Sequence, residues 1–220
     1  MPVILVYNPA TNAVERYTRS VNEAMPYIIG STLTVGEFRA NSKSGVLWTD
    51  RRTMNAWNVF RRIWERGIYV GYAFKRIWEG GHDPQSQHYA GMAFDTGQNL
   101  FPAERNMLRA AAINSEVWSY VEPAYLTPTW VHFDKRLWFP ACAVGGYPVV
   151  RYGSKGVYVL VLQDALSAIG YTGLELDGDF GPKTQAAVIR FQSDQGLAVD
   201  GVVGCSTWET LTPMASGVGM

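Results

Sequence analysis

Two short segments constrain this chain more than any other part of its sequence. The first spans residues 86–95 and reads SQHYAGMAFD, and the second spans residues 130–134 and reads WVHFD. The chain has 3 histidines, and two of them, His88 and His132, lie in these segments. With Asp95 they offer three ligands of the kinds that zinc prefers, and three protein ligands leave a fourth position open, as in catalytic zinc sites. The sequence therefore predicts one zinc ion held by these three side chains.

The alternation of small and large residues indicates how the first segment presents its carboxylate. If residues 91–95 form a strand, Gly91 and Ala93 lie on the same face as Asp95, and the residues between them point into the core. The two small residues would leave an open shelf beside the carboxylate. His88 has the opposite parity, so we expect it to reach the site from the preceding loop, 80–85, which is rich in turn-forming residues.

Composition excludes several classes of protein. The chain has 220 residues, of which 47% are hydrophobic and 17% charged, which is typical of a globular protein of one or two domains. Its formal net charge of zero gives no case for a nucleic-acid partner. No apolar run reaches the length of a membrane span, and the N-terminus lacks the basic and apolar regions of a signal peptide. We expect a monomer with neither nucleic acid nor membrane as partner.

The pattern Ser-x-His-x-x-Gly-x-Ala-x-Asp, followed by Trp-Val-His, closely resembles the zinc D-alanyl-D-alanine peptidases of the M15 family. The resemblance covers residues 35–135. It implies an α+β fold with helices against a small antiparallel sheet, and a zinc metallopeptidase that cuts the stem peptides of bacterial peptidoglycan, as a D-alanyl carboxypeptidase or an endopeptidase. A wall enzyme without a signal peptide is expected to leave the cell by a non-classical route or by phage-type lysis.

The part of the chain upstream of residue 141 mixes helical and strand patterns. Asp50 is placed to cap a helix over residues 53–66, which Gly67 would end. Residues 68–74 are typical of a buried strand, and a second helix is predicted over residues 102–115 with a proline at its start. This mixture predicts the α+β class.

Glycines and a proline within residues 141–150 predict a linker. It divides the chain into a peptidase domain at 1–140 and a second domain at 151–212, with a tail at 213–220. The two cysteines, Cys142 and Cys205, fall on opposite sides of most of this linker, so a bridge between them is possible but not favoured.

The second domain contains an internal repeat. The pattern Asp-Gly-x-Phe/Val-Gly-x-x-Thr occurs at residues 177–184 and 200–207, each time before a predicted helix. With the surrounding apolar positions, this pattern closely resembles the peptidoglycan-binding domain 1 family, a three-helix module, and implies peptidoglycan as the partner. Asp177 and Asp179 do not complete a calcium loop because Val188 stands where a glutamate is needed, so we interpret them as turn builders.

The sequence offers several candidates for the catalytic base. Many M15 enzymes carry a Glu or His three or two residues before the last ligand, but this chain has threonine and tryptophan at 129 and 130. Asp134 follows His132 by two residues and shares its strand face, so we hypothesise that it is the general base or a group that orients a ligand. Glu122 and His82 are weaker candidates. The departure also leaves open a non-catalytic wall-binding protein with a degenerate peptidase domain.

Two residues are candidates for binding substrate. The resemblance places Arg76 where a guanidinium can pair with a substrate carboxylate, because the two groups form a bidentate fork. The alternatives are that Arg76 is a surface charge or that Lys75 takes this role. Ser86 either binds substrate or only forms hydrogen bonds within its own loop.

Overall fold

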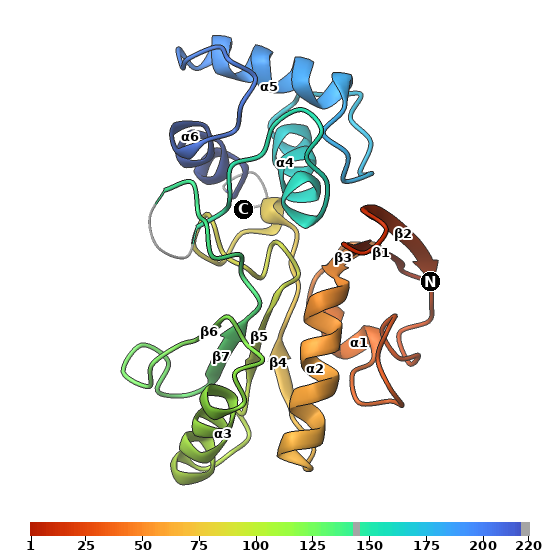
Figure 1. Cartoon of the computed structure of the whole chain (residues 1–220), viewed down its shortest axis with the longest axis vertical. Helices are drawn as coiled ribbons and strands as arrows, with labels where there is room; N and C mark the ends of the chain where they lie inside the picture. The colour runs from red at the N-terminus through yellow and green to blue at the C-terminus, as the bar shows by residue number, and fades with distance from the viewer. Residues whose placement is uncertain (143–145, 217–220) are drawn as a thin grey trace.

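The computed structural model describes residues 1–142 and 146–216 and has two small sheets and six α-helices within them (Figure 1). This confirms the mixed α+β class. In chain order the elements are β1 (Val3–Asn8), β2 (Ala13–Thr18), α1 (Val35–Arg39), β3 (Val46–Asp50), α2 (Arg51–Trp64), β4 (Val70–Tyr72), the 3-10 helix η1 (Ile77–Glu79), β5 (Ala93–Thr96), α3 (Pro102–Asn114), β6 (Tyr120–Val121), β7 (Val131–Asp134), α4 (Val157–Ala168), α5 (Pro182–Asp194) and α6 (Cys205–Ser216). None of the described helices is long and apolar enough to span a membrane.

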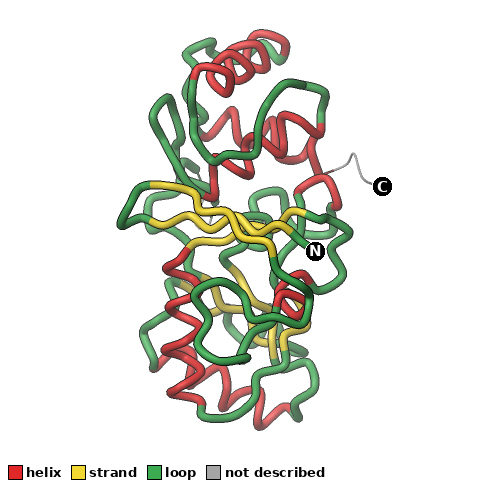
Figure 2. The backbone as a smooth tube through the Cα atoms, turned by 90° about the vertical axis from the view of Figure 1, so that its right-hand side faces the viewer, coloured by secondary structure: helices red, strands yellow, loops and turns green. Residues whose placement is uncertain are grey.

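The N-terminal sheet has the order β2-β1-β3, with β1 antiparallel to β2 and parallel to β3. Its centre is apolar because Ile4 and Val6 of β1 are fully buried. The sheet lies across the middle of the molecule, beneath the three C-terminal helices (Figure 2). Sequence analysis found no motif in this region and expected one small antiparallel sheet. The structure instead has two sheets, one of them mixed.

Helix α2 begins and ends slightly earlier than expected. Asp50 caps it as predicted, with its buried carboxylate accepting the N–H of Arg52 at 2.7 Å. The helix ends at Trp64 because Glu65 adopts a left-handed conformation, so Gly67 is not the residue that ends it. Helix α3 matches its prediction to within one residue, while β4 is shorter than the predicted strand.

The second sheet has the order β4-β5-β7-β6 and is antiparallel throughout. Its register places Asp95 of β5 directly opposite His132 of β7. The neighbouring pair in this register is Phe94 and Phe133, which point to the other face and are fully buried. Trp118 packs on Phe133 with ring centroids 4.4 Å apart. Strand alternation therefore puts an aromatic core on one face and the polar site on the other.

Gly91 does not serve to leave open space beside the Asp95 carboxylate, as the alternation predicted. It has a φ of +66° and lies before β5, which begins at Ala93. A Cβ at this position would lie 1.9 Å from the carbonyl oxygen of Trp48, so only glycine permits this approach of the chain to β3. The small residue thus serves packing between the two sheets.

The C-terminal helices are joined by two turns built in the same way. The side-chain nitrogen of Gln163 donates to Asp177 and Thr184, and its oxygen accepts the N–H of Gly178. Gln192 makes the equivalent bonds in the second turn, to residues Asp200, Thr207 and Gly201. Each buried glutamine satisfies the backbone and side chain of the following Asp-Gly turn. The structure confirms the internal repeat and the turn-building role of the aspartates.

These helices dock closely on the rest of the molecule. All residues of α4 from 157 to 166 are buried, so this part of the helix is enclosed on every side. At the contact with η1, Asp164 forms an ion pair with Arg76 and accepts the N–H of Ile77 at 3.3 Å. Tyr158 donates to the side chain of Gln87 at 2.9 Å. The contact is extensive and contains buried polar bonds.

The two cysteines form a disulfide across the predicted linker. Cys142 and Cys205 have Cα atoms 4.8 Å apart and are bonded to each other, which corrects the expectation that a bridge was not favoured. Sequence spacing could not reveal the pair because docking of α6 brings residues 63 positions apart together. Part of the linker, residues 143–145, lies outside the described residues. Helix α6 continues to Ser216, beyond the point at 212 where the sequence indicated a tail.

Candidate metal centre

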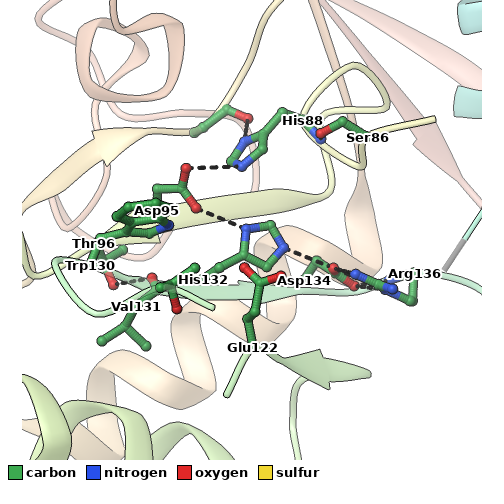
Figure 3. Close-up of polar contacts among 12 residues, drawn as sticks. Ser86, His88, Asp95, Thr96, Glu122, Trp130, Val131, His132, Asp134 and Arg136 are labelled. Carbon is green, nitrogen blue, oxygen red and sulfur yellow. Dashed lines mark hydrogen bonds and ion pairs between the residues drawn. The ribbon is translucent and has the colours of Figure 1, made fainter. Parts of the chain in front are cut away.

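The three predicted ligands come together on the polar face of the second sheet (Figure 3). His88 reaches in from the turn before β5, as expected, while Asp95 and His132 face each other across two paired strands. The Oδ1 atom of Asp95 lies 2.8 Å from Nδ1 of His132, and its Oδ2 atom lies 3.3 Å from Nε2 of His88. One carboxylate thus lies between two imidazoles, and these side chains offer one oxygen and two nitrogen ligands within 4.8 Å of one another.

The ring of His88 is held by a hydrogen bond at one nitrogen and has none to any described residue at the other. Its side chain is 2% exposed, and its Nδ1 lies 2.9 Å from the carbonyl oxygen of Ala73, to which it donates. This bond fixes the tautomer, so Nε2 carries the lone pair. Nε2 is buried and makes no well-formed hydrogen bond within the described part of the chain. A buried acceptor without a partner is costly unless something binds it, and a zinc ion fits this nitrogen and its neighbouring ligands.

His132 is held from both sides by carboxylates. Its Nδ1 faces Asp95, and its Nε2 lies 3.0 Å from Oδ2 of Asp134. Burial opposes protonation, but the hydrogen bonds and charges of Asp134 and Asp95 outweigh it and raise the pKa of His132 to about 9. A carboxylate behind an imidazole is the usual support of a metal-binding histidine, since it orients the ring and makes its other nitrogen more basic.

Asp134 is placed as a support rather than as a base that faces substrate. Its side chain is fully buried and is bound by Arg136, whose Nε lies 2.8 Å from Oδ1, as well as by His132. Burial would raise the pKa of Asp134, but these hydrogen bonds lower it. Of the two roles predicted for Asp134, the geometry favours orienting His132.

A cleft of about 740 Å³ opens over the three ligands. The residues that line it come from the loop before β5, from β5 itself, from β6, β7 and the loop between them, from the segment that follows β7, and from α6: His82, Asp83, Pro84, Gln85, Ser86, Gln87, His88, Asp95, Tyr120, Glu122, Leu126, Thr127, Trp130, His132, Arg136, Cys142, Gly146, Glu209, Thr212 and Pro213. Its size suits a short peptide segment rather than a folded protein chain.

Glu122 and His82 occupy different positions in this cleft. The carboxylate of Glu122 points toward the ring of His132 (Figure 3) and has no hydrogen bond or ion pair to any described side chain. Its backbone N–H donates to the carbonyl oxygen of His132 at 2.9 Å, which fixes its place beside the site. His82 stacks on His88 with ring centroids 4.6 Å apart, and burial above all lowers its pKa to about 3. Glu122 is therefore the better-placed proton acceptor.

Arg76 is not in the cleft. Its guanidinium is paired with Asp164 of α4, contacts Ser44 at 3.2 Å and lies over the ring of Trp48. This placement corrects the expectation that it holds a substrate carboxylate, and it is equally unlike a surface charge. The sequence could not show this because the partner lies 88 positions away.

Ser86 lies at the edge of the cleft and bonds its own loop. Its Oγ accepts the N–H of His88 at 3.3 Å, and its carbonyl oxygen accepts the hydroxyl of Tyr147 at 2.8 Å. Ser86 thus forms a hydrogen bond within its own loop, and its position in the cleft lining leaves its binding of substrate a prediction.

One wall of the cleft is shaped by an arginine that no sequence motif indicated. Arg109 of α3 is 5% exposed and donates to the carbonyl oxygens of Glu122, Thr127 and Trp130. It therefore fixes the loop between β6 and β7 against the helix. The sequence did place an arginine on the apolar face of a predicted helix, and a buried guanidinium there needs hydrogen-bond acceptors nearby.

Comparison with known proteins identifies the C-terminal helices. Residues 155–211 match the family described as "Putative peptidoglycan binding domain", which confirms the second resemblance. An uncharacterized protein of the bpoA1 3' region of Kitasatospora aureofaciens is 42% identical over 82 residues, which cover 35% of this chain and 70% of that protein. The chain thus has a wall-binding module beside a His-Asp-His cleft. It belongs to the family of the Kitasatospora protein.

Two cell-wall hydrolases match over shorter stretches. The zinc D-Ala-D-Ala carboxypeptidase of Streptomyces albus G is 48% identical over 61 residues, which cover 27% of this chain and 24% of that enzyme. The N-acetylmuramoyl-L-alanine amidase CwlL of Bacillus licheniformis is 41% identical over 69 residues, which cover 29% of this chain and 19% of the amidase. The chain spans less than a quarter of the length of either hydrolase.

Proposed function

We propose that this protein is a zinc-dependent peptidase that hydrolyses peptide bonds in the stem peptides of bacterial peptidoglycan, as a D-alanyl carboxypeptidase or an endopeptidase. Its C-terminal module directs it to the cell wall. The observation that carries the proposal is the buried Nε2 of His88, which makes no well-formed hydrogen bond to the described residues and lies 3.3 Å from Oδ2 of Asp95, near His132 in a peptide-sized cleft. The partial similarity to a zinc D-Ala-D-Ala carboxypeptidase supports the same reaction class.

Each residue of the site has a role that follows from its contacts. His88, Asp95 and His132 would hold the zinc ion, which when bound supplies a Lewis acid that polarises a peptide carbonyl and lowers the pKa of water. Ala73 fixes the tautomer of His88 through its carbonyl oxygen. Asp134 accepts a hydrogen bond from Nε2–H of His132, which leaves the lone pair of Nδ1 to face the ion.

Glu122 is proposed as the group that takes the proton of the attacking water. It would replace the Glu or His that many M15 peptidases, which this chain resembles, carry shortly before the last ligand, and it directly follows β6 instead. Its carboxylate stays available because no described side chain binds it, and its backbone is fixed by β7 and by Arg109. The carboxylate can then pass the proton to the leaving amine, the usual exchange of a general base and acid.

The test is digestion of purified peptidoglycan stems by the zinc-loaded protein, followed by mass spectrometry. Release of one terminal D-alanine would identify a carboxypeptidase, and cleavage within the stem an endopeptidase. The matched variants are His88→Ala and His132→Ala, which should lose both zinc and hydrolysis. Wall binding without hydrolysis by the zinc-loaded protein would favour a degenerate peptidase domain that only binds the wall.

A further inference from the structure

The cleft over the metal ligands has walls from both parts of the chain. Its far wall is helix α6 of the wall-binding module, which contributes Glu209, Thr212 and Pro213. Thr212 is fully buried and gives its hydroxyl to the carbonyl oxygen of Trp208, so it closes the wall without offering a polar group. Glu209 is exposed, and it is therefore the polar group of this wall that a substrate would meet.

Several bonds hold α6 in this position. The disulfide joins Cys205, the first residue of α6, to Cys142 at the edge of the cleft. The indole of Trp208 donates to the carbonyl oxygen of Pro148 at 2.8 Å, and its ring packs on Tyr147. Tyr147 in turn bonds the loop that carries His88. The module is thus fixed beside the metal ligands and is not a loosely tethered anchor.

The charge of the cleft favours a cation. Among the lining residues that the structure describes, three acids, Asp83, Glu122 and Glu209, stand outside the proposed ligand set. Arg136 is the only lysine or arginine in this lining, and Asp134 already binds it. Glu209 has no ion pair among the described residues, and its carboxylate oxygen lies within 4.8 Å of both sulfur atoms of the disulfide. An unneutralised carboxylate held at a cleft wall attracts a positive group.

We propose that Glu209 selects stem peptides whose diamino acid still carries a free side-chain ammonium group. The inference rests on the proposed function, since a stem peptide has only this one cationic side chain, while its other charged groups are carboxylates. Cross-linking converts the ammonium into a neutral amide. The protein would therefore act preferentially on stems that are not cross-linked through that amine.

The test compares two soluble peptides, N-acetyl-L-Ala-γ-D-Glu-L-Lys-D-Ala-D-Ala with the lysine amine free and the same peptide with that amine acetylated. The wild-type protein should prefer the free amine by about fivefold in kcat/KM, as expected for one partly exposed ion pair. The difference should lie in KM, because the contact is remote from the reacting bond. Glu209→Gln should bring the ratio near one, and Glu209→Lys should invert it.

Glu175→Gln is the matched control, since Glu175 is an exposed carboxylate of the same module outside the cleft lining. It should keep the wild-type preference. Equal cleavage of both peptides by wild type, or an unchanged preference in Glu209→Gln, would overturn the inference while leaving the peptidase intact. If neither peptide is cut, the proposed function fails. Equilibrium binding of the two peptides to wild type and Glu209→Gln then decides the role of Glu209 separately, with equal affinities refuting it.

Discussion

The ion pair between Arg76 and Asp164 predicts that replacing Arg76 lowers the stability of the fold more than replacing Asp164 does. Asp164 is 1% exposed and Arg76 is 12% exposed. Arg76→Met leaves the carboxylate with one hydrogen bond, from the N–H of Ile77 at 3.3 Å. Removing one partner of a buried pair typically costs about 3–5 kcal/mol, and we expect Arg76→Met to lower the free energy of unfolding by about 3–4 kcal/mol.

Asp164→Leu should cost less, about 2 kcal/mol, because the guanidinium keeps other contacts and some solvent. It retains Ser44 at 3.2 Å and lies 4.9 Å from the ring centroid of Trp48. The double variant Arg76→Met/Asp164→Leu leaves no buried charge at this site, so its stability should return to within about 1 kcal/mol of wild type. Burial raises the pKa of Asp164, so the cost of Arg76→Met should also shrink as the pH falls and the carboxyl takes up a proton.

Urea unfolding followed by tryptophan fluorescence measures the four stabilities, and peptide hydrolysis by the same proteins separates two roles for Arg76. As an interface residue, Arg76 can be replaced in the double variant without loss of zinc or activity. Activity that stays lost in a stable double variant would refute this account and restore Arg76 as a substrate-binding residue. Equal costs for the two single variants would refute the argument from burial.

Three further predictions concern the site and the disulfide. Glu122→Gln should lower kcat about a hundredfold or more with zinc retained, whereas Asp134→Asn should mainly weaken zinc binding, by about 10- to 100-fold. Metal titration and kinetics measure the two effects in both variants, and the reverse pattern would make Asp134 the base. The pKa of His132 is about 9 in the folded protein against an ordinary value of 6.5, so in zinc-free protein its protonation stabilises the fold fully below pH 6.5, and this contribution is lost as the pH rises through 9. Urea unfolding at pH 6 and pH 10 should show this fall in stability, and equal stabilities would contradict it. Replacing Cys142 and Cys205 by serine should cost about 4 kcal/mol of stability, from the loop entropy of a 63-residue separation, and an unchanged denaturation midpoint would show that docking alone fixes α6.

Local patterns predicted the elements that local forces determine. The cap at Asp50 and the proline at the start of α3 depend on neighbouring backbone groups, and both helices begin close to where these residues placed them. The Asp-Gly repeat of the C-terminal module was readable for the same reason. The two-residue period of a strand also predicted that His132 and Asp134 share a face, which their hydrogen bond confirms.

Contacts between segments that are distant in the chain could not be predicted from the sequence. The pairing of β1 with β3 and the bond between Cys142 and Cys205 depend on how units dock, and no local pattern encodes either. The same limit explains Arg76, whose partner lies in α4, and the contribution of α6 to the cleft. The candidate ligands could be predicted because their motif is compact, while the residues around them depend on tertiary structure.

The central claim is that His88, Asp95 and His132 hold a zinc ion that this chain uses to cut stem peptides. The most direct measurement follows hydrolysis of a defined stem peptide by mass spectrometry through removal and return of zinc. The account predicts about one zinc per chain, loss of hydrolysis after chelation, recovery on adding one equivalent of zinc, and no recovery in His132→Ala. Hydrolysis that continues in fully zinc-free protein, or wild-type metal content in His132→Ala, would contradict it.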